Sequence, residues 1–349
     1  MSQIFESAIA GESAAEEGVQ LTKKDFMSDQ VIRWCPGCGD YSILSQTQTV
    51  LAALGLPTEK VAIVSGIGCS SRFPYYVNSY GFHTIHGRAA TIATGLKMSR
   101  PELSVWMVTG DGDALSIGGN HTAHVLRRNV DLQILLFNNR IYGLTKGQYS
   151  PTSEQGKKTK STPFGSLDHP FNPAAFALGC DASFVARTVD IFTKDQRDVM
   201  HAAYAHKGAS FVEIYQNCNI FNDGAWDALT EKVTREERVL MLKHGEPMVF
   251  AGGRKGIRLN GLRPEVVELG EGGLGPDDCL KHDETDPFLG AVIARMDFPE
   301  FPVPMGVIHR RERPTYEVLA NEQIDAVQAK SGKGTLQKLL LGGETWKVD

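Results

Sequence analysis

Two short polar motifs have the residue types that hold a divalent cation against a phosphate group. Gly110-Asp111-Gly112 ends one apolar, β-branched run, and Asn138-Asn139 ends the next. In a parallel sheet both runs would finish at the same carboxyl edge, where open α/β folds bind their ligands. Asp111 offers a carboxylate and Asn139 an amide oxygen, a ligand set that suits Mg²⁺ bound to a diphosphate. The glycines would let the backbone approach the phosphates closely.

The spacing of the two motifs resembles the thiamine diphosphate motif, with thirty residues from Gly110 to Asn139 inclusive. This pattern is specific because it needs two elements, each at a strand end. The alternative is that Gly-Asp-Gly is an ordinary turn and Asn-Asn an ordinary loop. A dinucleotide-binding fingerprint is excluded, because Leu115 stands where that motif needs a third glycine.

The elements that must position these motifs follow an α/β pattern. The resemblance implies that they form a thiamine diphosphate-binding fold, with a mostly parallel sheet and helices on both faces. Further strands are expected at 61–64, 183–189 and 209–215, the last of these being the final strand of the sheet. Helices are expected at 41–54, 89–98, 117–128, 173–178 and 193–206. Residues 143–170 form a long loop, and a loop of that length in a compact domain is usually functional or bound to a partner.

The chain divides by character into three parts. Residues 1–28 are polar and predict a mobile arm or a strap over a partner, and 29–225 form the cofactor-binding domain. Residues 226–349 are a C-terminal extension that could pack on a partner subunit. Within it, 231–244 predicts a charged helix, and 252–275 has short strand-like pieces.

Composition excludes several classes of protein. Of the 349 residues, 42% are apolar and 22% charged, as in ordinary soluble proteins. A net charge of -5 gives no case for nucleic-acid binding. The apolar runs are too short to cross a bilayer, and the N-terminus has no signal-peptide core, so we expect a cytoplasmic protein with no membrane contact. Its six cysteines are therefore not expected to form disulfides.

The cysteines indicate a second centre, either a redox dithiol or a metal site. Cys35 and Cys38 form a Cys-x-x-Cys pair, which alone fits a redox dithiol, structural zinc or an iron–sulfur cluster. Cys69 and Cys218 both follow predicted strands, so folding could bring them to the same edge of the sheet. No metal-binding role is expected for the other two cysteines. Cys180 is expected to end a helix as a small buried residue, and Cys279 to be an ordinary surface thiol in an acidic loop.

With these cysteines included, residues 30 to 225 resemble the β subunit of a 2-oxoacid:ferredoxin oxidoreductase. The resemblance rests on Cys-Pro-Gly-Cys-Gly, Gly-Ile-Gly-Cys-Ser, His-Gly-Arg, the Gly-Asp-Gly and Asn-Asn pair, Tyr-Gly-Leu-Thr-Lys-Gly-Gln and a late Asn-Cys, in that order. In that family four cysteines hold one [4Fe-4S] cluster. The positions that match them are Cys35, Cys38, Cys69 and Cys218.

The resemblance also implies roles for residues around the cofactor. The Mg²⁺ ligands would be the side chains of Asp111 and Asn139 and the carbonyl of Ile141. His86 would contact the cofactor, although a helix-capping or core histidine is the alternative. The remaining cofactor contacts are implied for the loop against the thiamine ring, the diphosphate turn and the chain that passes over it: Ile67, Gly68, Cys69, Ser70, Gly112, Asp113, Gly143 and Leu144.

The implied reaction is oxidative decarboxylation of a 2-oxoacid to its acyl-CoA and CO₂, with electrons passed singly through the cluster to ferredoxin. Coenzyme A takes the acyl group. Thiamine enzymes activate the cofactor with a glutamate from a second domain, which this chain lacks. The resemblance therefore implies an α subunit that supplies this glutamate, and it leaves the chain inactive alone.

The resemblance implies 2-oxoglutarate as the substrate, because family members that accept it tend to carry a basic residue near the position of Arg72. A guanidinium can bind the distal carboxylate through two hydrogen bonds. A surface or interface ion pair is the alternative role for Arg72, and pyruvate or another 2-oxoacid is the alternative substrate. Lys146 could contact substrate or coenzyme A, although a solvated lysine explains it more simply. Two other functions remain as hypotheses: a non-redox thiamine diphosphate decarboxylase or ligase, and a binding module with a zinc clamp at Cys35 and Cys38.

Overall fold

In the part of the chain that the computed structural model describes, residues 20–270 and 273–348, eight strands form one sheet in the order β2-β1-β3-β4-β6-β5-β11-β7. The strands from β2 to β5 are parallel, β11 is antiparallel to β5, and β7 is parallel to β11. The strands are β1 (Val61–Ser65), β2 (Tyr80–His83), β3 (Ser104–Gly110), β4 (Leu132–Asn138), β5 (Phe184–Val189), β6 (Ala209–Tyr215), β7 (Val239–Met241) and β11 (Val303–Arg310). The predicted mostly parallel sheet is confirmed.

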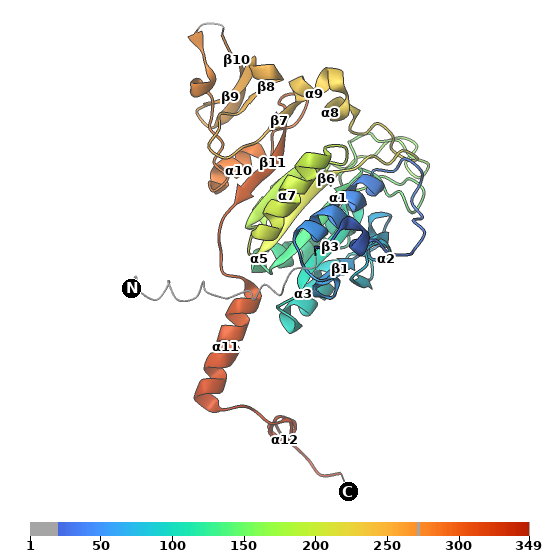
Figure 1. Cartoon of the computed structure of the whole chain (residues 1–349), viewed down its shortest axis with the longest axis vertical. Helices are drawn as coiled ribbons and strands as arrows, with labels where there is room; N and C mark the ends of the chain where they lie inside the picture. The colour runs from blue at the N-terminus through green and yellow to red at the C-terminus, as the bar shows by residue number, and fades with distance from the viewer. Residues whose placement is uncertain (1–19, 271–272, 349) are drawn as a thin grey trace.

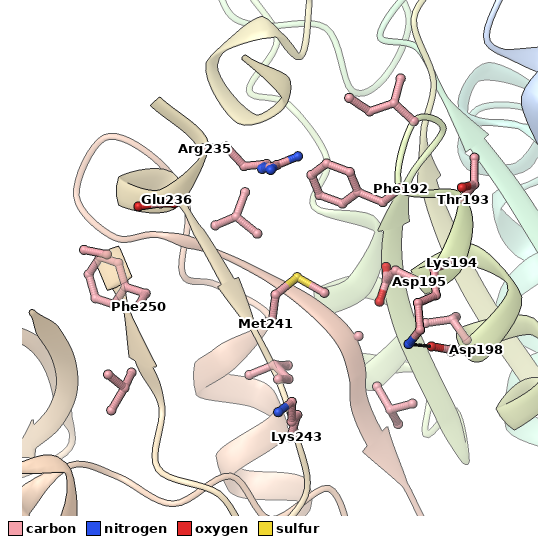
Figure 2. Close-up of a pocket in the computed structure, with 18 of the residues that line it drawn as sticks. Phe192, Thr193, Lys194, Asp195, Asp198, Arg235, Glu236, Met241, Lys243 and Phe250 are labelled. Carbon is pink, nitrogen blue, oxygen red and sulfur yellow. Dashed lines mark hydrogen bonds and ion pairs between the residues drawn. The ribbon is translucent and has the colours of Figure 1, made fainter. Parts of the chain in front are cut away.

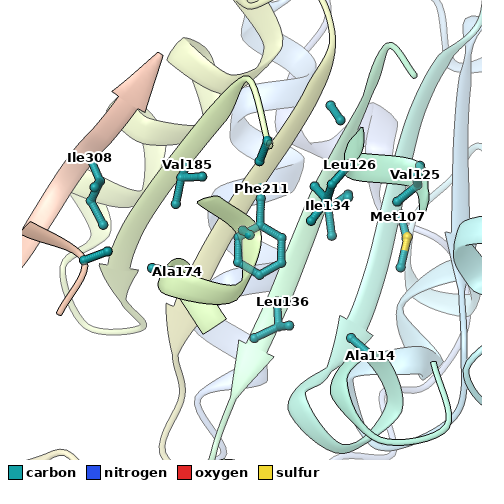
Figure 3. Close-up of a cluster of buried hydrophobic side chains, with 14 of the residues drawn as sticks. Met107, Ala114, Val125, Leu126, Ile134, Leu136, Ala174, Val185, Phe211 and Ile308 are labelled. Carbon is teal, nitrogen blue, oxygen red and sulfur yellow. The ribbon is translucent and has the colours of Figure 1, made fainter. Parts of the chain in front are cut away.

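Helices cover both faces of the sheet, which explains why its central strands are apolar throughout. On β3, Val105 and Met107 join the side chains of one set of helices, while Trp106 and Val108 join those of the other. Figure 3 shows the first cluster, in which Met107 lies with Leu126 and Ile134. This face carries α3 (Ala89–Ser99), α5 (Gly119–Arg128), α6 (Pro173–Gly179) and α10 (Pro287–Ile293); the opposite face carries α1 (Asp40–Ala53) and α7 (Thr193–Ala205). The chain thus forms the three layers of an α/β fold.

The region after Trp226 departs from the sequence prediction at two points. β6 is not the last strand of the sheet, because β11 and β7 extend it beyond β5. The predicted helix at 231–244 is also too long: α9 (Lys232–Arg238) stops where the chain enters β7. Both errors arise because pairing with distant strands, and not local pattern, determines β7 and β11. The sheet therefore contains strands from both sides of the predicted boundary at 225.

Smaller elements complete the C-terminal region. A separate antiparallel sheet, in the order β10-β9-β8, corresponds to the predicted strand-like pieces. In Figure 1, α11 runs away from the body of the molecule and α12 lies beyond it. These elements are α8 (Asp227–Thr230), β8 (Val249–Phe250), η4 (Ala251–Gly253), β9 (Lys255–Asn260), β10 (Arg263–Glu268), η6 (Pro276–Asp278), α11 (Tyr316–Ser331) and α12 (Leu336–Leu340).

The N-terminal region lies partly outside the described residues, which begin at 20, so the predicted arm at 1–28 is seen only at its end. There η1 (Lys23–Phe26) buries Phe26 fully in the core beside α1. The other short elements are η2 (Thr58–Lys60), η3 (Ser70–Arg72), α2 (Phe73–Tyr76) and α4 (Asp111–Leu115). No helix among the described residues is long and apolar enough to span a membrane.

Two cysteines outside the predicted cluster set have different outcomes. Cys180 ends α6, partly buried against the core. Cys279 is buried, so the prediction of a surface thiol is wrong. Its sulfur packs on β9, and a Cβ added at Gly256 would lie 2.2 Å from Sγ. This contact joins segments that are distant in sequence, which local composition cannot reveal.

Candidate active site at the carboxyl edge of the sheet

The two motifs meet at one edge of the sheet. β3 and β4 are neighbours, with Gly110 in register with Phe137. Asp111 opens α4 directly after β3, and Asn139 follows the end of β4. The parallel pairing therefore places the carboxylate and the amide on adjacent strand ends, as their spacing predicts.

Asp111 is buried among hydroxyl groups that the sequence analysis did not identify. Its Oδ2 accepts hydrogen bonds from Ser150 Oγ at 2.5 Å and Thr152 Oγ1 at 2.6 Å. Thr152 Oγ1 also lies 2.9 Å from Asn138 Oδ1. Burial raises the pKa of Asp111, and these hydroxyls partly oppose that rise. The long loop therefore closes over this edge, and a buried carboxylate of this kind favours a bound cation.

Both polar atoms of the Asn139 side chain are hydrogen-bonded. Its Oδ1 accepts a hydrogen bond from the Ile141 backbone N–H at 3.1 Å, and its Nδ2 donates to Gln216 Oε1 at 2.9 Å. The amide oxygen therefore lies toward the turn that contains Ile141, whose carbonyl is the third predicted Mg²⁺ ligand. Asp111, Asn139 and Ile141 stay predicted ligands, and their oxygen donors fit the preference of Mg²⁺.

Asp113 fastens two loops together at the same edge. Its Oδ1 accepts hydrogen bonds from the backbone N–H groups of Ile67 at 3.1 Å and Gly87 at 2.7 Å, and it lies 2.6 Å from His86 Nδ1. Its Oδ2 accepts from Thr109 Oγ1 at 2.7 Å. The carboxylate thus positions the loop from Ile67 to Ser70 and the segment at His86. Direct cofactor contacts of Asp113, His86 and this loop stay predictions.

Two glycines lie where the chain passes close to its neighbours at this edge, and Gly112 leaves no room for a Cβ. A Cβ at Gly112 would lie 2.2 Å from the ring of Tyr142, whose hydroxyl donates to the Gly112 carbonyl at 3.1 Å. A Cβ at Gly143 would lie 3.5 Å from Cys218 Sγ and 3.7 Å from Cys69 Sγ. Gly143 therefore marks the place where the predicted diphosphate cover meets two of the predicted cluster ligands. Leu144, next to it, is exposed.

The segments that carry the four cysteines are tied together by hydrogen bonds. Trp34 Nε1 donates to the Cys69 carbonyl at 2.6 Å, which joins the Cys35–Cys38 loop to the Cys69 loop. Two further bonds join it to the Cys218 segment. These are Gly39 N–H to the Asn217 carbonyl at 3.2 Å and Asn219 Nδ2 to the Pro36 carbonyl at 2.6 Å.

The thiols lie in one another's electrostatic field. Burial raises the pKa of Cys38 well above its usual range, with smaller contributions from Asp40, Cys218 and Cys69. Burial, Asp40, Cys218 and Cys35 raise the pKa of Cys69 to about 11, while Arg72 opposes the rise. Burial also raises the pKa of Asp40, a residue that the sequence analysis missed, to about 7.

The donor set of these segments fits an iron–sulfur cluster. Among residues 20–270 and 273–348, no three His, Cys, Asp or Glu side chains are grouped closely enough to hold one metal ion. Four cysteines on tied segments fit such a cluster, because thiolates are its ligands.

The two predicted substrate residues lie in different surroundings. Arg72 is half-buried at the end of η3, and its Nη1 donates to the Arg33 carbonyl at 2.8 Å. Lys146 is exposed in a turn, where its backbone N–H donates to the Gly143 carbonyl at 3.0 Å. Arg72 follows Cys69 in the chain, and Lys146 follows Gly143. Because Gly143 lies close to the Cys69 sulfur, both segments are at the same edge of the sheet. A substrate role for Arg72 or Lys146 remains a prediction.

Two cavities lie outside this edge or at its border. One, of about 810 Å³, lies between α7, α9, β7 and β8, and Figure 2 shows Phe192, Met241 and Phe250 among its lining. None of the predicted site residues lines it. The other, of about 630 Å³, lies beside Cys38, between the Cys35–Cys38 loop and Asp190. The second cavity therefore offers an approach from the surface to the predicted cluster.

Comparison with known proteins identifies the family of this chain. Residues 66–214 match a family described as "Thiamine pyrophosphate enzyme, C-terminal TPP binding domain". Over 332 residues the chain is 54% identical to the 2-oxoglutarate oxidoreductase subunit KorB of Mycobacterium tuberculosis, covering 93% of this chain and 88% of the relative. The chain belongs to the family of 2-oxoacid:ferredoxin oxidoreductase β subunits. The resemblance seen in its sequence motifs is therefore confirmed.

Two further proteins match this chain over different lengths. The β subunit of 2-oxoacid:ferredoxin oxidoreductase 1 from Aeropyrum pernix is 43% identical over 209 residues, which is 60% of this chain and 64% of the relative. A solved 2-oxoglutarate:ferredoxin oxidoreductase from Magnetococcus marinus, with 2-oxoglutarate, coenzyme A and succinyl-CoA bound, superposes with a TM-score of 0.74 at 31% identity. That match covers 95% of this β subunit and 98% of the solved chain. The C-terminal region thus belongs to the shared fold of these two proteins.

Proposed function

We propose that this β subunit, joined to an α subunit, oxidatively decarboxylates 2-oxoglutarate to succinyl-CoA and CO₂ and passes electrons singly to ferredoxin. The observation that carries the proposal is the meeting of two loops at Gly143, where Cys69 and Cys218 lie beside the chain that follows Asn139. When bound, thiamine diphosphate would supply the electron sink for decarboxylation, and a [4Fe-4S] cluster would supply one-electron transfer. The identity to KorB and the ligands bound in the solved neighbour support this substrate.

The residues of this chain have definable roles in that reaction. Asp111, Asn139 and the Ile141 carbonyl would hold Mg²⁺ on the diphosphate, and Asp113 would position the Cys69 loop. Ser150 and Thr152, each 2% exposed, close the long loop over Asp111 and exclude water from it. Cys35 is exposed, so a cluster bound there would lie near the surface that ferredoxin approaches. The activating glutamate would come from the α subunit.

The test is to measure turnover by the αβ complex on a panel of 2-oxoacids, with coenzyme A and either ferredoxin or a viologen dye. We expect reduction of the acceptor that depends on coenzyme A, with 2-oxoglutarate as the preferred substrate and no turnover by the β subunit alone. Preference for pyruvate would contradict the substrate assignment. Decarboxylation by an iron-free complex would favour a non-redox thiamine enzyme instead.

Arg72 provides a specific test of the substrate. Replacing it with alanine is expected to raise KM for 2-oxoglutarate by about 10- to 100-fold, because a charge-assisted pair contributes roughly 1.5 to 3 kcal/mol. Pyruvate has no distal carboxylate, so its KM should change much less. The measurement is steady-state kinetics of the αβ complex on both substrates.

Arg72→Lys is the matched variant, because it keeps the charge and removes the planar fork. It should fall between the parent and the alanine variant for 2-oxoglutarate. Equal changes in KM for both substrates would assign Arg72 to its bond with the Arg33 carbonyl and not to substrate binding.

A further inference from the structure

Gln216 lies between the two predicted cofactor centres. It follows β6 directly, and its backbone N–H donates to the Asn138 carbonyl at 3.0 Å, which fixes it beside the end of β4. Its side chain is 1% exposed. A buried amide loses its contacts with water, so each of its polar atoms needs a partner in the protein.

The partners of Gln216 come from both centres. Its Nε2 donates to Cys38 Sγ at 3.4 Å and to the Asn217 carbonyl at 2.5 Å. Its Oε1 accepts from Asn139 Nδ2 at 2.9 Å. The Asn217 carbonyl can only accept a hydrogen bond, so the nitrogen of Gln216 must face it and the oxygen must face Asn139. The orientation of the amide is therefore determined by its surroundings.

We propose that Gln216 is a positioning residue that holds one ligand of each centre, Cys38 for the cluster and Asn139 for Mg²⁺. This inference rests on the proposed function, because it assumes that both centres are occupied. An N–H bond to a thiolate sulfur withdraws charge from the cluster and raises its reduction potential. The bond from Asn139 orients the amide so that its Oδ1 can serve the metal, as residues behind metal ligands commonly do.

Two substitutions separate these roles. Gln216→Leu removes both the donor to Cys38 and the acceptor for Asn139. Gln216→Glu keeps an acceptor for Asn139 and removes the amide N–H groups. If the glutamate is protonated, its one O–H has the Asn217 carbonyl as the nearer acceptor, so the bond to Cys38 is lost in either state.

The experiment uses the αβ holoenzyme and two readouts other than turnover. An EPR-monitored redox titration gives the midpoint potential of the cluster, and fluorescence quenching at fixed Mg²⁺ gives Kd for thiamine diphosphate. We expect both Gln216 variants to shift the midpoint potential to lower values. Only Gln216→Leu should weaken cofactor binding, by about 10- to 100-fold, the range typical of residues that support metal ligands.

Gln133→Leu is the matched control, because Gln133 is also a buried glutamine, on β4 near its opposite end. It should leave the potential and the Kd unchanged. An unchanged potential in both Gln216 variants, or equal Kd changes in the two, would overturn the inference. A parent enzyme without iron or without cofactor binding would instead overturn the proposed function, so the two failures are distinguishable.

Discussion

Replacing Asp111 with asparagine is expected to abolish Mg²⁺-dependent binding of thiamine diphosphate. The change removes the only charge among the three predicted Mg²⁺ ligands and keeps an oxygen for Ser150 and Thr152. Residues behind metal ligands contribute about 10- to 100-fold to metal affinity, so loss of a direct ligand should exceed about 100-fold. Fluorescence quenching by the cofactor, at several Mg²⁺ concentrations, measures this loss.

The melting temperature distinguishes loss of the metal ligand Asp111 from damage to the fold. The folded-state pKa of Asp111 is raised, so without a cation its carboxylate opposes folding once the pH exceeds the unfolded pKa. The asparagine variant without cofactor should therefore melt no lower than the parent at neutral pH. Added Mg²⁺ and cofactor should raise Tm of the parent alone. A variant whose Tm still rises with the cofactor would contradict the metal assignment.

The second large effect is expected for Cys218→Ser in the αβ complex. Loss of this thiolate should remove iron and visible absorbance and reduce 2-oxoglutarate-dependent dye reduction to background. Thiamine diphosphate binding should persist, because Cys218 follows β6 and is not among the predicted cofactor contacts. Cys69 is less suitable for this test, because its loop is also fastened to Asp113.

Iron analysis and absorbance spectra provide the measurement, and Cys180→Ser is the matched control. Cys180 is also partly buried but ends α6, in the cluster of side chains on one face of the sheet. It should keep its iron content and its turnover. A Cys218 variant with a full complement of iron would remove this cysteine from the cluster.

The strands of the centre could be predicted because their residues are apolar on both faces. The runs that became β3 and β4 are buried along almost their whole length, so local composition was enough. β11 could not be predicted in this way. It includes Pro304 and Gly306 and ends in Arg310, and it is a strand because β5 lies beside it. Such long-range pairing leaves little trace in a local pattern.

The residues of the site also differ in whether the local sequence predicts them. Asp111, Asn139 and the four cysteines lie in short motifs with set spacing, so they were identified without a structure. Ser150, Thr152 and Gln216 have no such motif, and their importance depends on contacts between distant segments. For Gln216 the local sequence shows only a glutamine that directly follows a predicted strand and precedes Asn-Cys, and this does not indicate a contact with Cys38 or Asn139.

The late position of β11 in the chain has a consequence for synthesis. β5 leaves the ribosome long before Val303–Arg310, so its outer backbone groups stay unpaired while the C-terminal third is still being translated. An unpaired strand edge is a template for association with other chains. Domains of this size commonly expose such edges in folding intermediates, where chaperones protect them. The outer edge of β5 in the nascent chain is therefore open to association with other chains until Arg310 has emerged.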